Sequence, residues 1–183
     1  NPLALDAVLD DIQVSGGVDD FWVLGDLVAL GPHPVAVLER LTSLPNINFV
    51  RGNTDRYVVS ADRPPPSLAD VCANPHLLPI LLEVAGTFAW TQGAITAAGW
   101  FAWLKQLPLE FHTRLPDGTR VLAVHASPGR DDGDGLAPEM PDALIQAQLR
   151  DCDADLIFVG HTHRSMDRRI GRWHVVNLGS VSN

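Results

Sequence analysis

The sequence has little cysteine, no long apolar segment and few basic residues. Its two cysteines, Cys72 and Cys152, are far apart in sequence and form no C-x-x-C pair. We therefore expect free thiols in a reducing compartment and no disulfide framework. No apolar stretch reaches the roughly 20 residues that a membrane-spanning helix needs. We therefore expect a cytoplasmic protein that makes no contact with a membrane.

The deficit of positive charge excludes a further class of partner. The chain has 13 Lys and Arg against 22 Asp and Glu, which gives a net charge of −9. Because binding to long nucleic acids or anionic membranes needs a basic face, neither partner is expected. An acidic enzyme can still take a small anionic substrate, since bound cations invert the local charge. The length of 183 residues predicts one globular domain, and the sequence leaves its oligomeric state open.

Four short apolar runs, at 21–24, 47–50, 121–124 and 156–159, are followed closely by polar residues that can bind a metal ion. Such runs are typical of strands buried on both faces, and the helical patterns that precede the first two favour an α/β fold with parallel strands. Since ligands lie beyond the carboxyl ends of such strands, we expect the residues that follow to meet at one edge. They are Asp26, Asn53, His125, His161 and His163. One carboxylate, one amide and three imidazoles predict a metal site, for two ions.

Each of these motifs also has an ordinary structural explanation. Gly25-Asp26 and Gly52-Asn53 are typical of turns. His125 could be a buried imidazole with a hydrogen-bond partner, and His161-Thr162-His163 could lie in a surface loop. Four such residues at the ends of four apolar runs are a rare coincidence, and this favours the metal site.

The segment 63–107 interrupts the alternation of helix and strand. It begins with the extended Arg63-Pro64-Pro65-Pro66 and continues as an apolar stretch, so we expect a helical insertion beside the sheet. Its tryptophans, Trp90, Trp100 and Trp103, are expected in the core, and the alternative is the wall of a substrate site. Further along, Pro116-Asp117-Gly118 predicts a hairpin between 111–115 and 120–124, and a last strand is expected over 173–178.

Taken in order, the motifs resemble those of the calcineurin-like metallophosphoesterase superfamily, in its small prokaryotic phosphoesterase branch. The residues that carry the resemblance are Gly25-Asp26-Leu27-Val28-Ala29-Leu30-Gly31-Pro32, Gly52-Asn53-Thr54-Asp55, His125-Ala126-Ser127-Pro128, Gly160-His161-Thr162-His163 and Asn177-Leu178-Gly179-Ser180-Val181. The resemblance covers nearly the whole chain. It implies an α/β fold of stacked mixed β-sheets flanked by helices, and two divalent ions chosen from Mn, Fe, Zn, Co or Ni.

The resemblance also implies a role for each ligand. Asp26 would bridge both ions, Asn53, His125 and His161 would complete one site, and His163 would bind the second ion. The second site would also need an Asp-x-His motif on the first strand of the fold, which this sequence does not contain. Because the chain opens at Asn1 without Met, we expect residues 1–183 to be a single metallophosphoesterase domain that lacks its N-terminal strand and its C-terminal end.

Five further residues are candidates for other parts in the chemistry. Thr54 stands where many relatives have a histidine that acts as general acid, and Asp55 would orient a metal ligand. His33 could supply the acid instead, or be an ordinary loop histidine. Arg51 and Arg56 would bind phosphate, and a structural ion pair is the alternative.

The expected function is hydrolysis of phosphomonoesters, phosphodiesters or nucleotide anhydrides by a hydroxide that two ions activate, with Asp26, Asn53 and His125 as catalytic residues. The alternative is a protein of the same fold that has lost catalysis and serves as a binding or regulatory module. An amidohydrolase is less consistent with the sequence, since the His-x-His motif comes late in the chain.

Overall fold

The computed structural model describes residues 1–182. In chain order its elements are α1 (Pro2–Val14), β1 (Phe21–Val23), α2 (Pro34–Thr42), β2 (Ile47–Phe49), α3 (Asn53–Val59), α4 (Leu68–Ala73), the short 3-10 helix η1 (Pro75–Leu77), α5 (Leu78–Ala97), α6 (Phe101–Lys105), β3 (Glu110–Arg114), β4 (Arg120–Val124), α7 (Asp142–Gln148), β5 (Leu156–Val159), β6 (Met166–Ile170) and β7 (Trp173–Asn177).

The strands form two sheets, as the sequence predicts. The smaller sheet pairs β1 with β2 in parallel, and the larger has the order β3-β4-β5-β7-β6. Within the larger sheet β4, β5 and β7 are parallel, while the edge strands β3 and β6 run antiparallel to their neighbours. The larger sheet is therefore mixed, and the two-stranded sheet is parallel. The predicted hairpin over 111–115 and 120–124 is present as β3 and β4.

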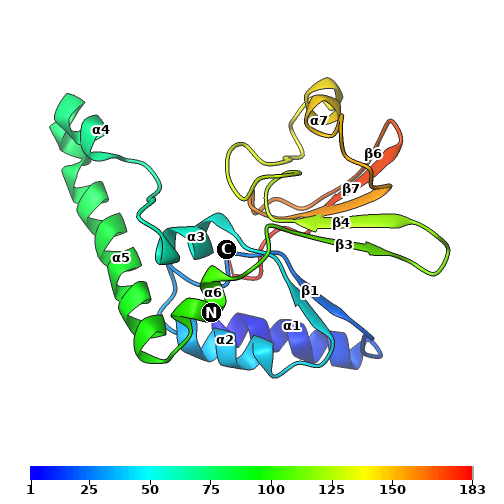
Figure 1. Cartoon of the computed structure of the whole chain (residues 1–183), viewed down its shortest axis with the longest axis horizontal. Coiled ribbons are helices and arrows are strands. Elements are labelled where there is room, and N and C mark those ends of the chain that lie inside the picture. The colour runs from blue at the N-terminus through cyan, green and yellow to red at the C-terminus, as the bar shows by residue number, and fades with distance from the viewer. Residues whose placement is uncertain (183) are drawn as a thin grey trace.

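Apolar side chains join the two sheets to each other and to the helices. Between the sheets, the Trp22 ring lies 5.6 Å from Phe111 and 5.7 Å from Phe158, measured between ring centroids. Figure 1 shows α1 and α2 beside the smaller sheet and α7 on the opposite side of the molecule, over the larger sheet. Helix α2 buries Leu38 and α7 buries Ile145, both in the core clusters behind their sheets. The order of layers is thus helix, sheet, sheet, helix.

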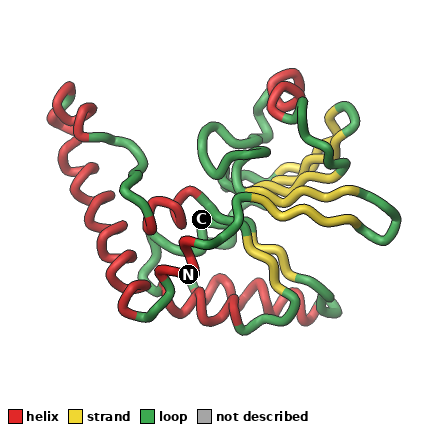
Figure 2. The backbone as a smooth tube through the Cα atoms, viewed as in Figure 1, coloured by secondary structure: helices red, strands yellow, loops and turns green. Residues whose placement is uncertain are grey.

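The segment 63–107 contains α4, η1, α5 and α6, and Figure 2 shows α4 and the first half of α5 extending away from the sheets. Trp100 and Trp103 pack against the core, with Trp103 5.1 Å from the Phe49 ring. Trp90 is 53% exposed, so the expectation of a core position is wrong for this tryptophan. Although α5 is largely apolar, no helix within residues 1–182 has the length and hydropathy needed to cross a membrane.

Candidate metal centre

The structure brings four of the predicted ligands together where β1, β2, β4 and β5 end. Asp26 lies in the turn after β1, Asn53 is the first residue of α3, His125 directly follows β4, and His161 follows β5 after one glycine. His125 is buried, and Asp26, Asn53 and His161 are partly buried. Two ligands come from each sheet, so the site lies where the two sheets meet.

The polar atoms of these side chains are close enough to share one ion. The Asn53 Oδ1 lies 3.0 Å from His125 Nε2 and 3.1 Å from His161 Nδ1. The two ring nitrogens are 3.2 Å apart, and His125 Nε2 is 3.4 Å from Asp26 Oδ2. Ligands about 2.1 Å from a common ion, in tetrahedral or octahedral geometry, are roughly 3.0–3.4 Å from one another. The observed spacings fall within that interval.

Backbone carbonyls determine which nitrogen of each imidazole carries the proton. His125 Nδ1 lies 2.6 Å from the Leu24 carbonyl oxygen, and His161 Nε2 lies 2.8 Å from that of Gly133. A carbonyl only accepts, so both of these nitrogens must be protonated and donate. In the neutral rings, His125 Nε2 and His161 Nδ1 then present lone pairs to the Asn53 oxygen. The Asn53 oxygen and these two ring nitrogens are atoms that can bind a cation placed between them. Histidines that bind metals usually donate from the other nitrogen in this way.

The charges of Asp26 and His125 are coupled. Burial favours neutral forms of both, yet the hydrogen bond and the opposite charge of Asp26 leave the pKa of His125 raised above its usual value. For the same reasons, and with two hydrogen bonds from Thr54, the pKa of Asp26 is lowered despite burial. A cation at this place would therefore compete with a proton for the ring.

The cluster depends on the Asn53 amide. Within residues 1–182, no three His, Cys, Asp or Glu side chains gather closely enough to hold an ion by themselves. Asn53 completes the set, because its oxygen is the atom that contacts both histidines. His163 lies two residues beyond His161 and is exposed, and its assignment to a second ion remains a proposal.

The backbone at three predicted ligands is in the left-handed region that non-glycine residues seldom adopt. Asp26, His161 and His163 have φ of 54°, 62° and 57°. Such conformations cost of order 1–3 kcal/mol each and occur preferentially at functional sites. Here they turn the chain sharply directly after a strand.

Thr54 and Asp55 fix the turn that carries Asp26. The Thr54 backbone N–H and its hydroxyl donate to Asp26 Oδ1, at 3.0 and 2.9 Å. The carboxylate of Asp55 is fully buried and accepts from the N–H groups of Gly52, Leu27 and Val28. Burial, with the nearby charge of Asp26, raises the pKa of Asp55 to about 7, against the effect of these hydrogen bonds. Asp55 contacts backbone around the ligands, whereas its expected role was to orient a ligand directly.

Comparisons with known proteins address the family and the fold of the chain. The family model of the calcineurin-like phosphoesterase superfamily domain matches residues 3–183. The chain belongs to this superfamily. A metallophosphoesterase from Sphaerobacter thermophilus has 26% identity and a TM-score of 0.72, over 99% of this chain and 72% of that one. A hypothetical protein from Pyrococcus horikoshii has the same fold, with 21% identity and a TM-score of 0.76 over 97% of this chain and 71% of that one. The predicted family and fold are confirmed.

Two curated relatives carry the name symmetrical bis(5'-nucleosyl)-tetraphosphatase. The one from Erwinia tasmaniensis is 27% identical over 83% of this chain and 47% of its own length. The one from Cronobacter sakazakii is 26% identical over 82% of this chain and 44% of its own length. The chain thus spans about half the length of the curated relatives it matches.

In this phosphoesterase domain the predicted phosphate-binding arginines are engaged with carboxylates. Arg51 Nε lies 2.7 Å from Asp131, and Arg56 bonds to Asp131, Asp132 and Asp62. Asp131 is only 5% exposed and holds both guanidinium groups. This favours the structural ion pair that the sequence left open. No sequence pattern pointed to Asp131 beyond its place in an acidic, glycine-rich loop.

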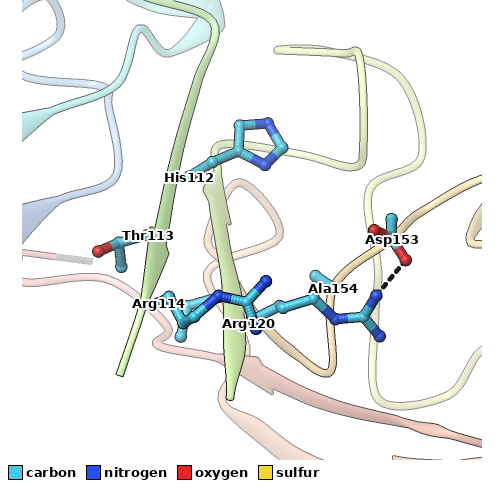
Figure 3. Close-up of a pocket in the computed structure, with 7 residues that line it drawn as sticks. His112, Thr113, Arg114, Arg120, Asp153 and Ala154 are labelled. Atoms are coloured by element: carbon cyan, nitrogen blue, oxygen red, sulfur yellow. Dashed lines mark hydrogen bonds and ion pairs between the residues drawn. The ribbon is translucent and has the colours of Figure 1, made fainter. Parts of the chain in front are cut away.

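Two other features of the domain lie apart from the cluster. His33 is exposed and forms the N-cap of α2 without a side-chain capping bond. A groove of about 370 Å³ lies on the outer hairpin, lined by His112, Thr113, Arg114, Arg120, Val121, Asp153 and Ala154. Figure 3 shows the Arg120 guanidinium paired with Asp153, and it also bonds to Asp155. That groove contains none of the predicted site residues.

Proposed function

We propose that this chain is the metal-binding part of a phosphoesterase that hydrolyses small phosphorylated substrates, with nucleotide anhydrides as the favoured class. The observation that carries the proposal is the convergence of four potential ligand atoms, from Asp26, Asn53, His125 and His161, which are linked by separations of 3.0, 3.1, 3.2 and 3.4 Å. The names of the two curated relatives support the nucleotide class.

Two divalent ions would be held by this domain, drawn from Mn, Fe, Zn, Co or Ni. One would lie among Asp26, Asn53, His125 and His161, and the other would be held by Asp26 and His163 with residues that this sequence does not supply. Bound ions would polarise the phosphoryl oxygens of the substrate and lower the pKa of water.

The protein's own groups would keep this site in order. The carbonyls of Leu24 and Gly133 hold the two imidazoles in the tautomer that presents a lone pair, and Thr54 holds the Asp26 carboxylate. Thr54 cannot donate a proton to an alkoxide at neutral pH, so substrates with good leaving groups are favoured. Free Cys72 and Cys152 fit a reducing compartment, and we place the activity in the cytoplasm.

A titration of the purified chain with Mn²⁺, followed by calorimetry, tests the metal site, with Asn53→Ala and His161→Ala expected to weaken binding. A parallel panel of bis-p-nitrophenyl phosphate, p-nitrophenyl phosphate and diadenosine tetraphosphate tests the activity. The same panel can be repeated on a version of the protein to which an Asp-x-His segment has been added. If both versions bind metal and neither hydrolyses a substrate, the alternative of a binding or regulatory module is supported. Absence of metal binding would reject both the metal site and the proposed chemistry.

A further inference from the structure

A second groove lies between the loop that carries Asp26 and the middle of α5. Its volume is about 510 Å³, within the range of small-molecule sites, and it is lined by Leu30, Gly31, Pro32, Gly86, Thr87 and Trp90. None of these residues has an ionisable side chain. The groove therefore suits an uncharged, largely apolar group.

The groove exposes two large apolar side chains. Trp90 is 53% and Leu30 73% exposed, whereas Trp100 and Trp103 pack on the core. Leu30 and the preceding Ala29 have φ of 60° and 80°, a strained backbone for residues with side chains. Gly86 has no heavy atom within 4 Å of where a Cβ would lie, so the space beside Trp90 stays open.

The groove is tied to the metal centre through the loop itself. Leu30 is four residues after Asp26, so their Cα atoms are at most about 14 Å apart. The loop is held in place because Asp55 accepts from the N–H groups of Leu27 and Val28, and the Thr54 Oγ1 lies 2.9 Å from the Val28 carbonyl oxygen. A nucleoside with its phosphate chain can span such a distance.

We propose that this groove binds the base of a nucleotide whose phosphates lie at the candidate metal centre. The inference rests on the proposed function and adds the substrate class and its site. The ring of Trp90 offers a stacking surface that every base can use, and Leu30 and Pro32 form the opposite wall. In this arrangement the charged phosphates lie at the cations, and the neutral base lies on a surface without charges. The site thus matches a nucleotide, which has a charged end and an uncharged end.

The test measures binding of a non-hydrolysable ADP analogue, with a methylene bridge between its phosphates, to the Mn²⁺-loaded protein by calorimetry. Trp90→Ala should weaken binding by about 5- to 150-fold, as expected for the loss of one base stack. Gly86→Leu should weaken binding too, because it fills the groove, and it should fold well because leucine favours a helix. Gly93→Leu is the matched control: Gly93 lies on the same helix, is exposed, has nothing within 4 Å of its Cβ position and is outside the groove.

Inorganic tripolyphosphate separates this proposal from the proposed function. Its affinity should be the same in the wild type, Trp90→Ala and Gly86→Leu. If tripolyphosphate binds with metal but the variants leave the affinity for the ADP analogue unchanged, the base site is rejected and the metal centre stands. If neither phosphate ligand binds, the proposed function fails. In that case adenosine alone tests the groove. It should quench tryptophan fluorescence in the wild type, and this quenching should be absent in Trp90→Phe.

Light scattering on the same variants addresses the other possible occupant, a second copy of the chain. If the wild type is a dimer that Gly86→Leu separates and Gly93→Leu does not, the groove is covered by the partner copy and the base site is rejected. If the oligomeric state is the same in all variants, the weakened nucleotide binding belongs to the groove.

Discussion

The tautomer of His161 depends on a carbonyl that the acidic loop 129–135 provides. Gly133 accepts from His161 Nε2, and two residues earlier in the loop Asp131 binds the guanidinium groups of Arg51 and Arg56. Because the arginines flank the Asn53 turn, their ion pairs fasten the loop to the part of the chain that carries Asn53. The arginines thus act on the site by holding its geometry. The sequence had suggested a different role for them, the binding of phosphate.

This connection predicts that Asp131→Asn lowers the affinity for Mn²⁺ by about 10- to 100-fold, as is usual when a group that orients a metal ligand is removed. The amide retains the size of the side chain but loses the charge that holds both arginines. Calorimetric titration measures the change, and Asp134→Asn, an exposed position in the same loop, is the control. Equal affinity in wild type and Asp131→Asn would show that the loop holds Gly133 without this ion pair.

The raised pKa of His125 predicts how metal binding depends on pH. A histidine must lose its second proton to bind an ion, so a pKa above the usual value of 6.5 means that the proton competes with the metal beyond that pH. We expect affinity to increase as the pH rises through 6.5 and to continue increasing above it. Titrations in buffers of different ionisation enthalpy should detect proton release on binding. In Asp26→Asn, where the charge that raises the pKa is absent, the rise should shift to lower pH.

Thr54 predicts a preference among leaving groups. A general acid typically contributes about 10²–10⁴ in rate, and poor leaving groups need it most. In the metal-loaded protein, Thr54→His should raise the turnover of alkyl phosphomonoesters more than that of aryl phosphodiesters. Thr54→Val is the necessary control, because Thr54→His also removes the hydroxyl that bonds to Asp26. Equal effects on both substrates, with His33→Ala silent, would mean that neither residue governs leaving-group preference.

At the scale of elements, strands with a strong apolar pattern could be predicted from the sequence, and helices and strands without such a pattern could not. The four runs became β1, β2, β4 and β5, each with its predicted polar residue beyond its end. Strand β6 was missed because its central residues, Asp167, Arg168 and Arg169, are charged, as an exposed edge strand allows. Helix α3 was missed because Tyr57, Val58 and Val59 are residue types more typical of strands.

The chain just beyond β1 approaches the chain just beyond β2 so closely that Gly25 and Gly52 leave no room for a side chain. A Cβ on Gly25 would lie 2.3 Å from the Gly52 nitrogen, and one on Gly52 would lie 2.2 Å from Asp26 Oδ1. We expect Gly25→Ala and Gly52→Ala to lower the free energy of unfolding by about 1–3 kcal/mol through overpacking, and to reduce metal affinity. Gly93→Ala, in open space within α5, should raise it by about 0.5–1 kcal/mol. Chemical denaturation measures all three, and wild-type stability in Gly52→Ala would contradict this close approach.

At the scale of the whole molecule, the ligands are divided between two sheets that each have a core cluster of their own and share a smaller cluster between them. The sequence could predict that the ligands share an edge, since each follows a strand. It could not predict that the β1 and β2 ends belong to a different sheet from the β4 and β5 ends, because strand order depends on long-range packing. Nor could it predict the partners of Arg51 and Arg56, because Asp131 is distant in sequence and reaches them only through the folded loop.

This division predicts that metal contributes to the stability of the entire domain. An ion held by Asp26 and Asn53 from one sheet and by His125 and His161 from the other binds only when both are folded and in contact. At a metal concentration 100 times Kd, binding adds about 2.7 kcal/mol, which for a domain of this size corresponds to roughly 5–11 °C in Tm. Calorimetry of the Mn²⁺-loaded protein before and after chelation should show one transition that moves down by this amount. In His161→Ala the shift should shrink, because one ligand from the larger sheet is gone, and a shift of full size in that variant would place the stabilising ion elsewhere.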